Sequence, residues 1–133
     1  MAIQFSVTAR NASLDAIETA VGVSPTFELR SGAAPATCAA ADSGTLLASM
    51  ALPADWMSAA ANGSKALLGS WQDIAADAAG IAGHFRIKQG GVCHMQGSAS
   101  DTAGSGDLKL DNTNIAVGQQ VIISGFTLTA GGA

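Results

Sequence analysis

Residues 81–98 limit the fold more than any other part of the sequence. In Ile81–Lys88, small or apolar side chains alternate with basic ones, and this period of two is that of a β-strand. Gln89-Gly90-Gly91 predicts a turn, and Val92–Ser98 returns as the partner strand. We expect the apolar face of the first strand to point into a core and its basic face to meet solvent or an acidic partner. The basic side chains are those of His84, Arg86 and Lys88.

Other short segments with strand character are separated by turn and loop residues. We expect further strands at Thr26–Arg30, Thr45–Leu52, Ser64–Ile74, Leu108–Leu110 and Gln119–Thr129, the last with a bulge or bend at Gly125. Ser31–Gly44, rich in alanine, glycine and proline, predicts a long surface loop. Such a series is typical of antiparallel sandwiches rather than of βαβ folds. We therefore expect a mainly β protein, an antiparallel, jelly-roll-like β-sandwich with one N-terminal α-helix.

The predicted core combines apolar positions from both halves of the chain. It comprises Phe27, Leu29, Ile81, Phe85, Ile87, Val121, Ile123 and Leu128. Trp56 and Trp71 could anchor an interface, but aromatic residues are so few that we expect both in the core.

The N-terminal part predicts an arm followed by a helix. Leu14, Ile17 and Val21 recur at i, i+3 and i+7, which indicates a helix over about residues 8–21 that ends at Gly22. Ahead of it Ile3, Phe5 and Val7 alternate, and these are our candidate subunit-interface residues. The same pattern fits an edge strand of the sandwich. We expect one domain over 1–133, with the arm and helix in 1–22 and the sandwich in 23–133.

The composition favours a subunit of an assembly. Charged residues make up 12% of the chain, against about a quarter in an average soluble domain, and there are 28 alanines and 16 glycines. Burying small side chains against a partner costs little solvation or entropy. A high-GC genome would also enrich alanine and glycine, without a structural purpose.

Charge and hydropathy exclude two classes of partner. Six basic and ten acidic side chains give a net charge of −4, whereas binding nucleic acid needs clustered lysine and arginine. No apolar run approaches the 18 or so residues of a transmembrane helix. We therefore expect neither a nucleic-acid nor a membrane partner.

Cys38 and Cys93 are the only cysteines, and two interpretations are open. A loop cysteine can meet a strand cysteine, so a Cys38–Cys93 disulfide is feasible and would contribute on the order of 4 kcal/mol to stability. Such a bridge could form after assembly in a reducing cytoplasm, once the protein is exposed outside the cell. Two buried free thiols are the simple alternative.

The sequence does not favour a metal site or an enzyme. With the cysteines, His84 and His94 are the candidate ligands, but adjacent strand residues such as Cys93 and His94 point to opposite faces. The chain also lacks the ligand spacing of structural zinc, a nucleophile elbow, a phosphate-binding loop and a zinc-protease motif. We expect no catalytic residues, no metal and no other cofactor.

Several stretches of the chain, covering nearly all of it, resemble one known family. The most specific are RNASLDAIE (10–18) and the closing pattern LDNTNI (110–115) with ISGFTLT (123–129). FELRSGAAPATC (27–38), SKALLGSWQDI (64–74) and AAGIAGHFRIKQGGVCHMQGS (78–98) add to the likeness. Together they resemble a family of small structural virion proteins of tailed bacteriophages and prophages, although that family does not require the two cysteines.

The resemblance implies a structural component of a virion without catalytic residues. Among virion roles we favour a capsid decoration (cement) protein, made in the host cytoplasm and bound to the capsid surface. Its partners would be the major capsid protein and copies of itself, as a dimer or trimer. The alternative is a tail, baseplate or fibre-associated subunit. A sugar- or adhesin-type module would need exposed aromatic residues, for which Trp56 is the one candidate.

Overall fold

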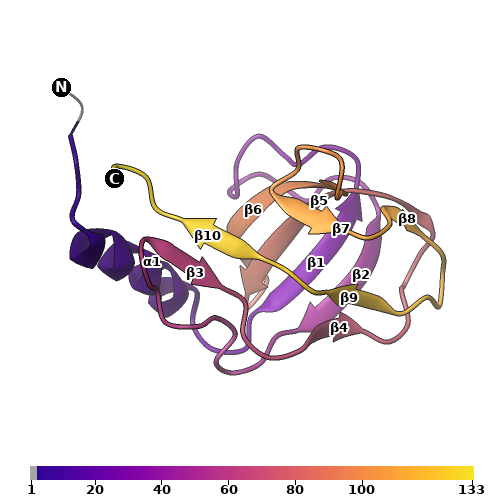
Figure 1. Ribbon diagram of the computed structural model, residues 1–133. Helices are drawn as coiled ribbons and strands as arrows, with labels where there is room; N and C mark the ends of the chain where they lie inside the picture. The colour runs from indigo at the N-terminus through magenta and orange to yellow at the C-terminus, as the bar shows by residue number, and fades with distance from the viewer. Residues whose placement is uncertain (1–2) are drawn as a thin grey trace.

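The computed structural model describes residues 3–133 and places them in one helix and ten strands. The helix is α1 (Val7–Val21). The strands are β1 (Thr26–Ser31), β2 (Leu46–Ala51), β3 (Ser64–Ala66), β4 (Trp71–Asp73), β5 (Gly80–Gln89), β6 (Val92–Asp101), β7 (Leu108–Leu110), β8 (Asn114–Ile115), β9 (Val121–Ile123) and β10 (Thr127–Thr129). The protein is mainly β with one N-terminal helix, as the sequence predicts (Figure 1).

The main sheet is built around the predicted hairpin. Its strand order is β2-β1-β5-β6-β7, and β8 also pairs with β5. At the β5–β6 turn, Gly90 and Gly91 have φ angles of 59° and 81°, the left-handed conformation that glycine adopts without strain. All pairs are antiparallel except β6–β7, which is parallel. The sheets are curled, but a jelly-roll-like strand order is not confirmed.

Two segments expected as single strands are each broken in two. Residues 64–74 form β3 and β4, and residues 119–129 form β9 and β10. The pieces pair crosswise, β3 with β10 and β4 with β9. The first break contains Gly69 with a φ of 78°, and the Leu67 N–H donates to the Phe126 carbonyl of the second break at 2.9 Å. These two small sheets form the layer that faces the main sheet (Figure 1).

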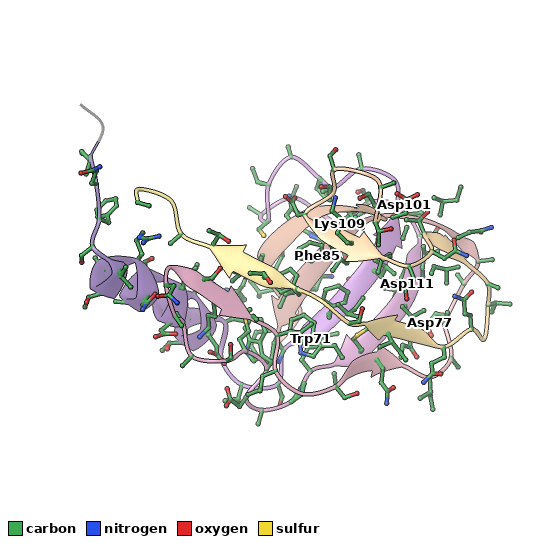
Figure 2. All side chains as sticks on the ribbon, viewed as in Figure 1. Trp71, Asp77, Phe85, Asp101, Lys109 and Asp111 are labelled. Atoms are coloured by element: carbon green, nitrogen blue, oxygen red, sulfur yellow. The ribbon has the colours of Figure 1, made fainter. Side chains whose placement is uncertain are left out.

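An aromatic cluster joins the two layers. Phe85 stacks on Phe27 with ring centroids 5.4 Å apart, and it meets Phe126 edge-on at 5.4 Å. Trp71 contacts Phe27 at 5.8 Å, Trp56 at 6.0 Å and Phe126 at 5.4 Å. Phe27 and Phe85 come from the main sheet, and Trp71 comes from β4 in front of it (Figure 2). Trp56 and Trp71 are therefore core residues, as expected.

The predicted core is confirmed at seven of eight positions. Phe27, Leu29, Phe85, Ile87, Val121 and Ile123 are buried, and Leu128 packs half-buried against them. The prediction for Ile81 is wrong, because this side chain is 66% exposed. The β1–β5 register changes between the pairs Arg30–His84 and Ser31–Ala82, which leaves Gly83 as an extra residue. An extra residue inverts the alternation beyond it, so Ala82 is buried and Ile81 points outward.

The helix forms close to where the sequence predicts it. The Ser6 hydroxyl caps its start by accepting the Ala9 N–H at 3.1 Å, and Gly22 follows its last residue with a φ of 95°. Leu14 and Val21 are buried, whereas Ile17 lies at the rim. Within residues 3–133, no helix has the length and apolar character needed to cross a bilayer.

Polar contacts fix α1 to the strands. Lys65 of β3 is buried, and its Nζ lies 2.7 Å from Asp15 Oδ1 and 2.8 Å from Glu18 Oε1 of the helix. At the other end, the Trp56 indole N–H donates to the Gly22 carbonyl at 3.0 Å. A buried charge is tolerated when it is paired, so these contacts hold the helix at one end of the molecule beside β3 (Figure 1).

Candidate functional site

The N-terminal segment leads away from the body of the molecule. Residues 3–6 belong to no strand, and Val7 is already the first residue of α1 (Figure 1). One backbone contact ties them to the other end of the chain, because the Phe5 N–H donates to the Gly132 carbonyl at 2.6 Å. The edge-strand interpretation is therefore wrong for the described residues. Ile3, Phe5 and Val7 are 79%, 54% and 45% exposed.

An apolar hollow of about 370 Å³ lies between this segment, α1 and the C-terminal strand. Phe5 lines it from the N-terminal side and residues 129–131 from the other side. The helix contributes the apolar Leu14 and Ile17 and the polar Arg10 and Ser13. Two of the lining side chains, Phe5 and Ile17, are exposed, and Ile3 and Val7 are exposed in the adjoining segment. A group of exposed apolar side chains marks an interaction surface more often than a single one does. We call Ile3, Phe5, Val7, Ile17 and this hollow the terminal surface.

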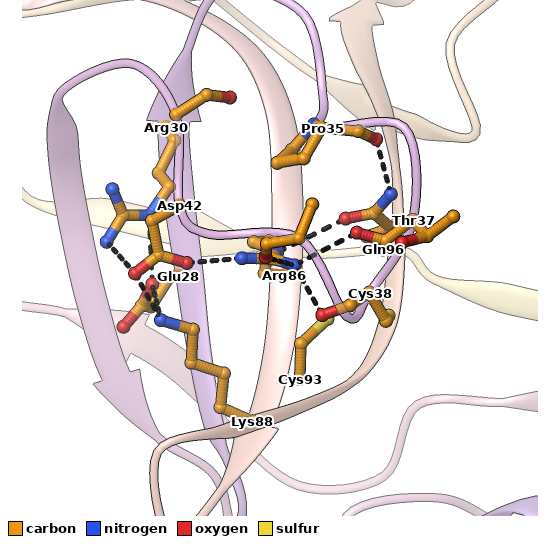
Figure 3. Close-up of polar contacts among 12 residues, drawn as sticks. Glu28, Arg30, Pro35, Thr37, Cys38, Asp42, Arg86, Lys88, Cys93 and Gln96 are labelled. Carbon is orange, nitrogen blue, oxygen red and sulfur yellow. Dashed lines mark hydrogen bonds and ion pairs between the residues drawn. The ribbon is translucent and has the colours of Figure 1, made fainter.

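A second candidate site lies on the face of the main sheet away from the aromatic core. Its charged side chains come from β1, β5 and the loop of residues 32–44, and they are Glu28, Arg30, Asp42, Arg86 and Lys88 (Figure 3). The prediction that His84, Arg86 and Lys88 face solvent is wrong, since they are 0%, 2% and 9% exposed. The loop folds back over this face, so β5 is covered on both sides. We call the five residues the charged cluster.

Arg86 connects the loop to the sheet. One of its terminal nitrogens pairs with Asp42, and the other donates to the carbonyl of Cys38 at 2.9 Å. Its Nε donates to Gln96 Oε1 at 3.2 Å, and the Gln96 amide donates to the Pro35 carbonyl at 2.7 Å (Figure 3). The planar guanidinium presents five N–H donors in a fixed fork, which suits several loop acceptors at once.

Asp42 is shared by three cations. Besides Arg86, it accepts from Lys88 Nζ at 2.7 Å and from an Arg30 terminal nitrogen at 3.2 Å. The hydrogen bond from Lys88, opposed in part by burial and assisted by Arg86 and Arg30, lowers the pKa of Asp42 to about 2. Burial alone would lower the pKa of Lys88, but hydrogen bonds to Asp42 and Glu28 raise it. The cluster thus consists of mutually paired charges that hold the loop in place.

The low pKa of Asp42 predicts acid sensitivity. A carboxylate whose pKa is lower in the folded than in the unfolded state stabilises the fold at pH values above its unfolded-state pKa. This contribution is lost as the pH falls through the folded-state pKa. The stability that Asp42 adds should therefore decline from its ordinary pKa of 3.8 down to about 2. Urea unfolding across this range should show a shallower pH dependence for Asp42→Asn than for wild type. The control Asp111→Asn, outside the cluster, should behave as wild type; an unchanged slope in Asp42→Asn would contradict the prediction.

The structure brings Cys38 and Cys93 together and keeps the histidines apart from them. Both cysteines are free and half-buried. His84 Nδ1 lies 2.9 Å from the Gly32 carbonyl, while its buried Nε2 has no partner among the described residues. His94 is exposed. Across residues 3–133, no group of three or more His, Cys, Asp or Glu side chains is placed to hold a metal ion.

Sequence reasoning missed the acidic half of the charged cluster, although part of it had a signal. Glu28 alternates with the core residues Phe27 and Leu29, which assigns it to the opposite face of β1. In the sheet it stands directly across from Arg86, and opposite charges at such positions favour pairing. Asp42, in an irregular loop, had no comparable signal.

The chain has no match among protein-family models, curated proteins or solved structures. Its resemblance to bacteriophage virion proteins stays a prediction, based on the sequence stretches quoted above. The terminal surface and the charged cluster are the features of the molecule from which a function can be inferred.

Proposed function

We propose that this protein is a non-enzymatic structural protein of a bacteriophage virion, and that it decorates the capsid by binding the major capsid protein. It would act at the capsid surface as a dimer or trimer, after synthesis in the host cytoplasm. The observation that carries the proposal is the terminal surface, because it gathers exposed apolar side chains at one end of a small, rigid β domain.

The N-terminal segment is suited to docking on another protein. Ile3 and Phe5 project beyond the capped start of α1, and Phe5 borders the apolar hollow. Covering a large apolar side chain that is exposed in the free protein contributes about 1.5–3 kcal/mol. The helix behind the segment is fixed to β3 through Lys65, so the surface is presented on a rigid support.

The distribution of charge supports a protein partner over a nucleic acid. Among the six basic residues, Lys65, Arg86 and Lys88 are buried and Arg30 is nearly so. Of these six lysine and arginine side chains, Lys109 is the one that is exposed in the described structure. The surface is therefore poorer in positive charge than the composition suggests. Protein interfaces are depleted in charged residues at their centres, whereas nucleic-acid surfaces need clustered cations.

The double substitution Ile3→Ser with Phe5→Ser tests the docking role. It removes two exposed apolar side chains but keeps the Ser6 cap, so the fold should be unaffected. We expect cosedimentation with capsids assembled from the major capsid protein to weaken at least about tenfold. Circular dichroism and the unfolding midpoint should match those of wild type. Ile74→Ser, which alters another exposed isoleucine far along the chain, is the matched control and should bind normally.

Three results would contradict the proposal at different points. If the double variant binds capsids as wild type does, the N-terminal segment is not the anchor. If wild-type protein fails to bind capsids but co-purifies with tails, the protein is a tail component rather than a decoration protein. If purified particles contain a handful of copies instead of hundreds, the capsid-surface role is wrong.

A further inference from the structure

Cys38 and Cys93 meet although 54 residues separate them in the sequence. Cys38 lies in the loop of residues 32–44 and Cys93 lies in β6, and both line the same hollow (Figure 3). The Cys93 sulfur is close enough to the Cys38 thiol to contribute to its raised pKa. The Cys93 thiol itself donates to the Met95 carbonyl at 3.4 Å. The fold thus places the single cysteine of the loop next to the single cysteine of β6, with no disulfide between them.

A bulge in β6 aims Cys93 at the loop. The β5–β6 register pairs Ile87 with Met95 but Lys88 with Cys93, so His94 is an extra residue. Met95 lies opposite a core residue, and without the bulge Cys93 would share its face. The extra residue instead places Cys93 on the face of Lys88, beneath the loop.

The loop side of the pair is positioned by an independent contact. Arg86 donates to the Cys38 carbonyl at 2.9 Å, so the backbone of Cys38 is held by a side chain that is itself buried. Both cysteines also line a hollow of about 400 Å³, together with Gly91 and Val92 of the β5–β6 turn. A small disulfide reagent in solution can reach the pair from this hollow.

We propose that Cys38 and Cys93 form a reversible intramolecular disulfide that locks the 32–44 loop over the charged cluster. The oxidant belongs to the class of small-molecule disulfides, such as oxidised glutathione. One cysteine thiolate attacks a sulfur of the reagent, releases one thiolate and forms a mixed disulfide. The second cysteine, as a thiolate, attacks the protein sulfur of that bond and releases the other half of the reagent. Two electrons pass to the reagent and both cysteine protons end on its two thiols or in solvent.

The environment of the pair predicts how fast the bridge forms. Burial, together with the neighbouring Cys93 sulfur, raises the pKa of Cys38 to about 11. Exchange starts from a thiolate, so oxidation should be slow in neutral buffer and faster in mildly alkaline buffer. This inference concerns the chain itself and holds whether or not the protein decorates a capsid.

The test uses the full-length protein, folded and in the absence of denaturant, incubated with oxidised glutathione. We expect the intact mass to fall by two hydrogen atoms, and both thiols to become resistant to alkylation. The melting temperature should rise by roughly 10 °C, because a bridge across a loop of this length constrains the unfolded chain. Dithiothreitol should restore the reduced mass and melting temperature. Protease cleavage within residues 33–43 should be slower in the oxidised protein.

Single variants separate a bridge from independent oxidation. Cys38→Ser should leave Cys93 to hold a stable glutathione adduct, and Cys93→Ser should do the same for Cys38. In both variants the rise in melting temperature should be lost. Two glutathione adducts on wild type, a dimer on a non-reducing gel, thiols that stay free over days, or a bridge that forms only in urea would each overturn the proposal.

Discussion

Replacing Phe85 by alanine is expected to lower the free energy of unfolding by about 3–5 kcal/mol. The ring is 2% exposed, stacks on Phe27 and meets Phe126 edge-on. It also lies over Gly97 of β6, where an added Cβ would stand 2.8 Å from a ring carbon. Truncation would therefore open a cavity between the main sheet and the strands facing it. Urea unfolding followed by tryptophan fluorescence reports on this site, because Trp71 belongs to the same cluster.

Ile81→Ala provides the matched control on the same strand. Ile81 lies beyond the Gly83 bulge and its side chain faces solvent. The free energy of unfolding should therefore change by no more than about 0.5 kcal/mol. The contrast between the two variants tests the bulge as well as the core. Equal losses at Phe85 and Ile81 would mean that β5 alternates without interruption and that the bulge is absent.

The features that sequence analysis predicted are those fixed by local periodicity. Alternation over residues 81–98 predicts the β5–β6 hairpin, and the spacing of Leu14 and Val21 predicts α1. Both patterns record which side chains are buried, and each repeats within about ten consecutive residues. For Ile3, Phe5 and Val7 the alternation left a subunit contact and an edge strand equally open, and their exposure removes the edge strand.

The features that it missed depend on single extra residues and on distant segments. Gly83 and His94 each add one residue to a strand, and each reverses which side chains face inward beyond it. A glycine inside a strand, such as Gly83, is compatible with a bulge, whereas His94 carries no mark of one. The breaks at Gly69 and near Phe126 are set by the crosswise pairing of strands whose paired residues are 48 to 65 positions apart in the sequence.

The charged cluster was missed for a further reason. A basic stripe on a strand ordinarily faces water, because burying a charge is unfavourable unless it is paired. Here the loop of residues 32–44 supplies the pairing, through Asp42 and a series of backbone carbonyls that Arg86 reaches. Every loop residue has a backbone carbonyl, so the residue types do not show which loop will supply acceptors to a buried arginine. The sequence therefore did not distinguish this loop from one that faces solvent.

Replacing Arg86 by methionine should be as destabilising as the loss of the Phe85 ring. The substitution fills much of the same volume but removes every donor that binds the loop. The carbonyls of Cys38 and Ala40 and the Gln96 amide oxygen would lose their partner, and Asp42 would keep only Lys88 and Arg30. Breaking a buried ion pair on one side costs about 3–5 kcal/mol, and we expect a loss of unfolding free energy in that range.

Three comparisons make the Arg86 prediction specific. Arg86→Lys should recover part of the stability, since lysine keeps the charge beside Asp42 but lacks the planar fork that reaches several acceptors. Lys109→Met, which removes an exposed cation, should change the free energy of unfolding by no more than about 0.5 kcal/mol. In folded Arg86→Met, proteases should cleave residues 33–43 faster than in wild type, because Arg86 is the main contact between that loop and β5. A variant that unfolds at the wild-type urea concentration and keeps its loop protected would mean that other contacts hold the loop and that the charged cluster is dispensable.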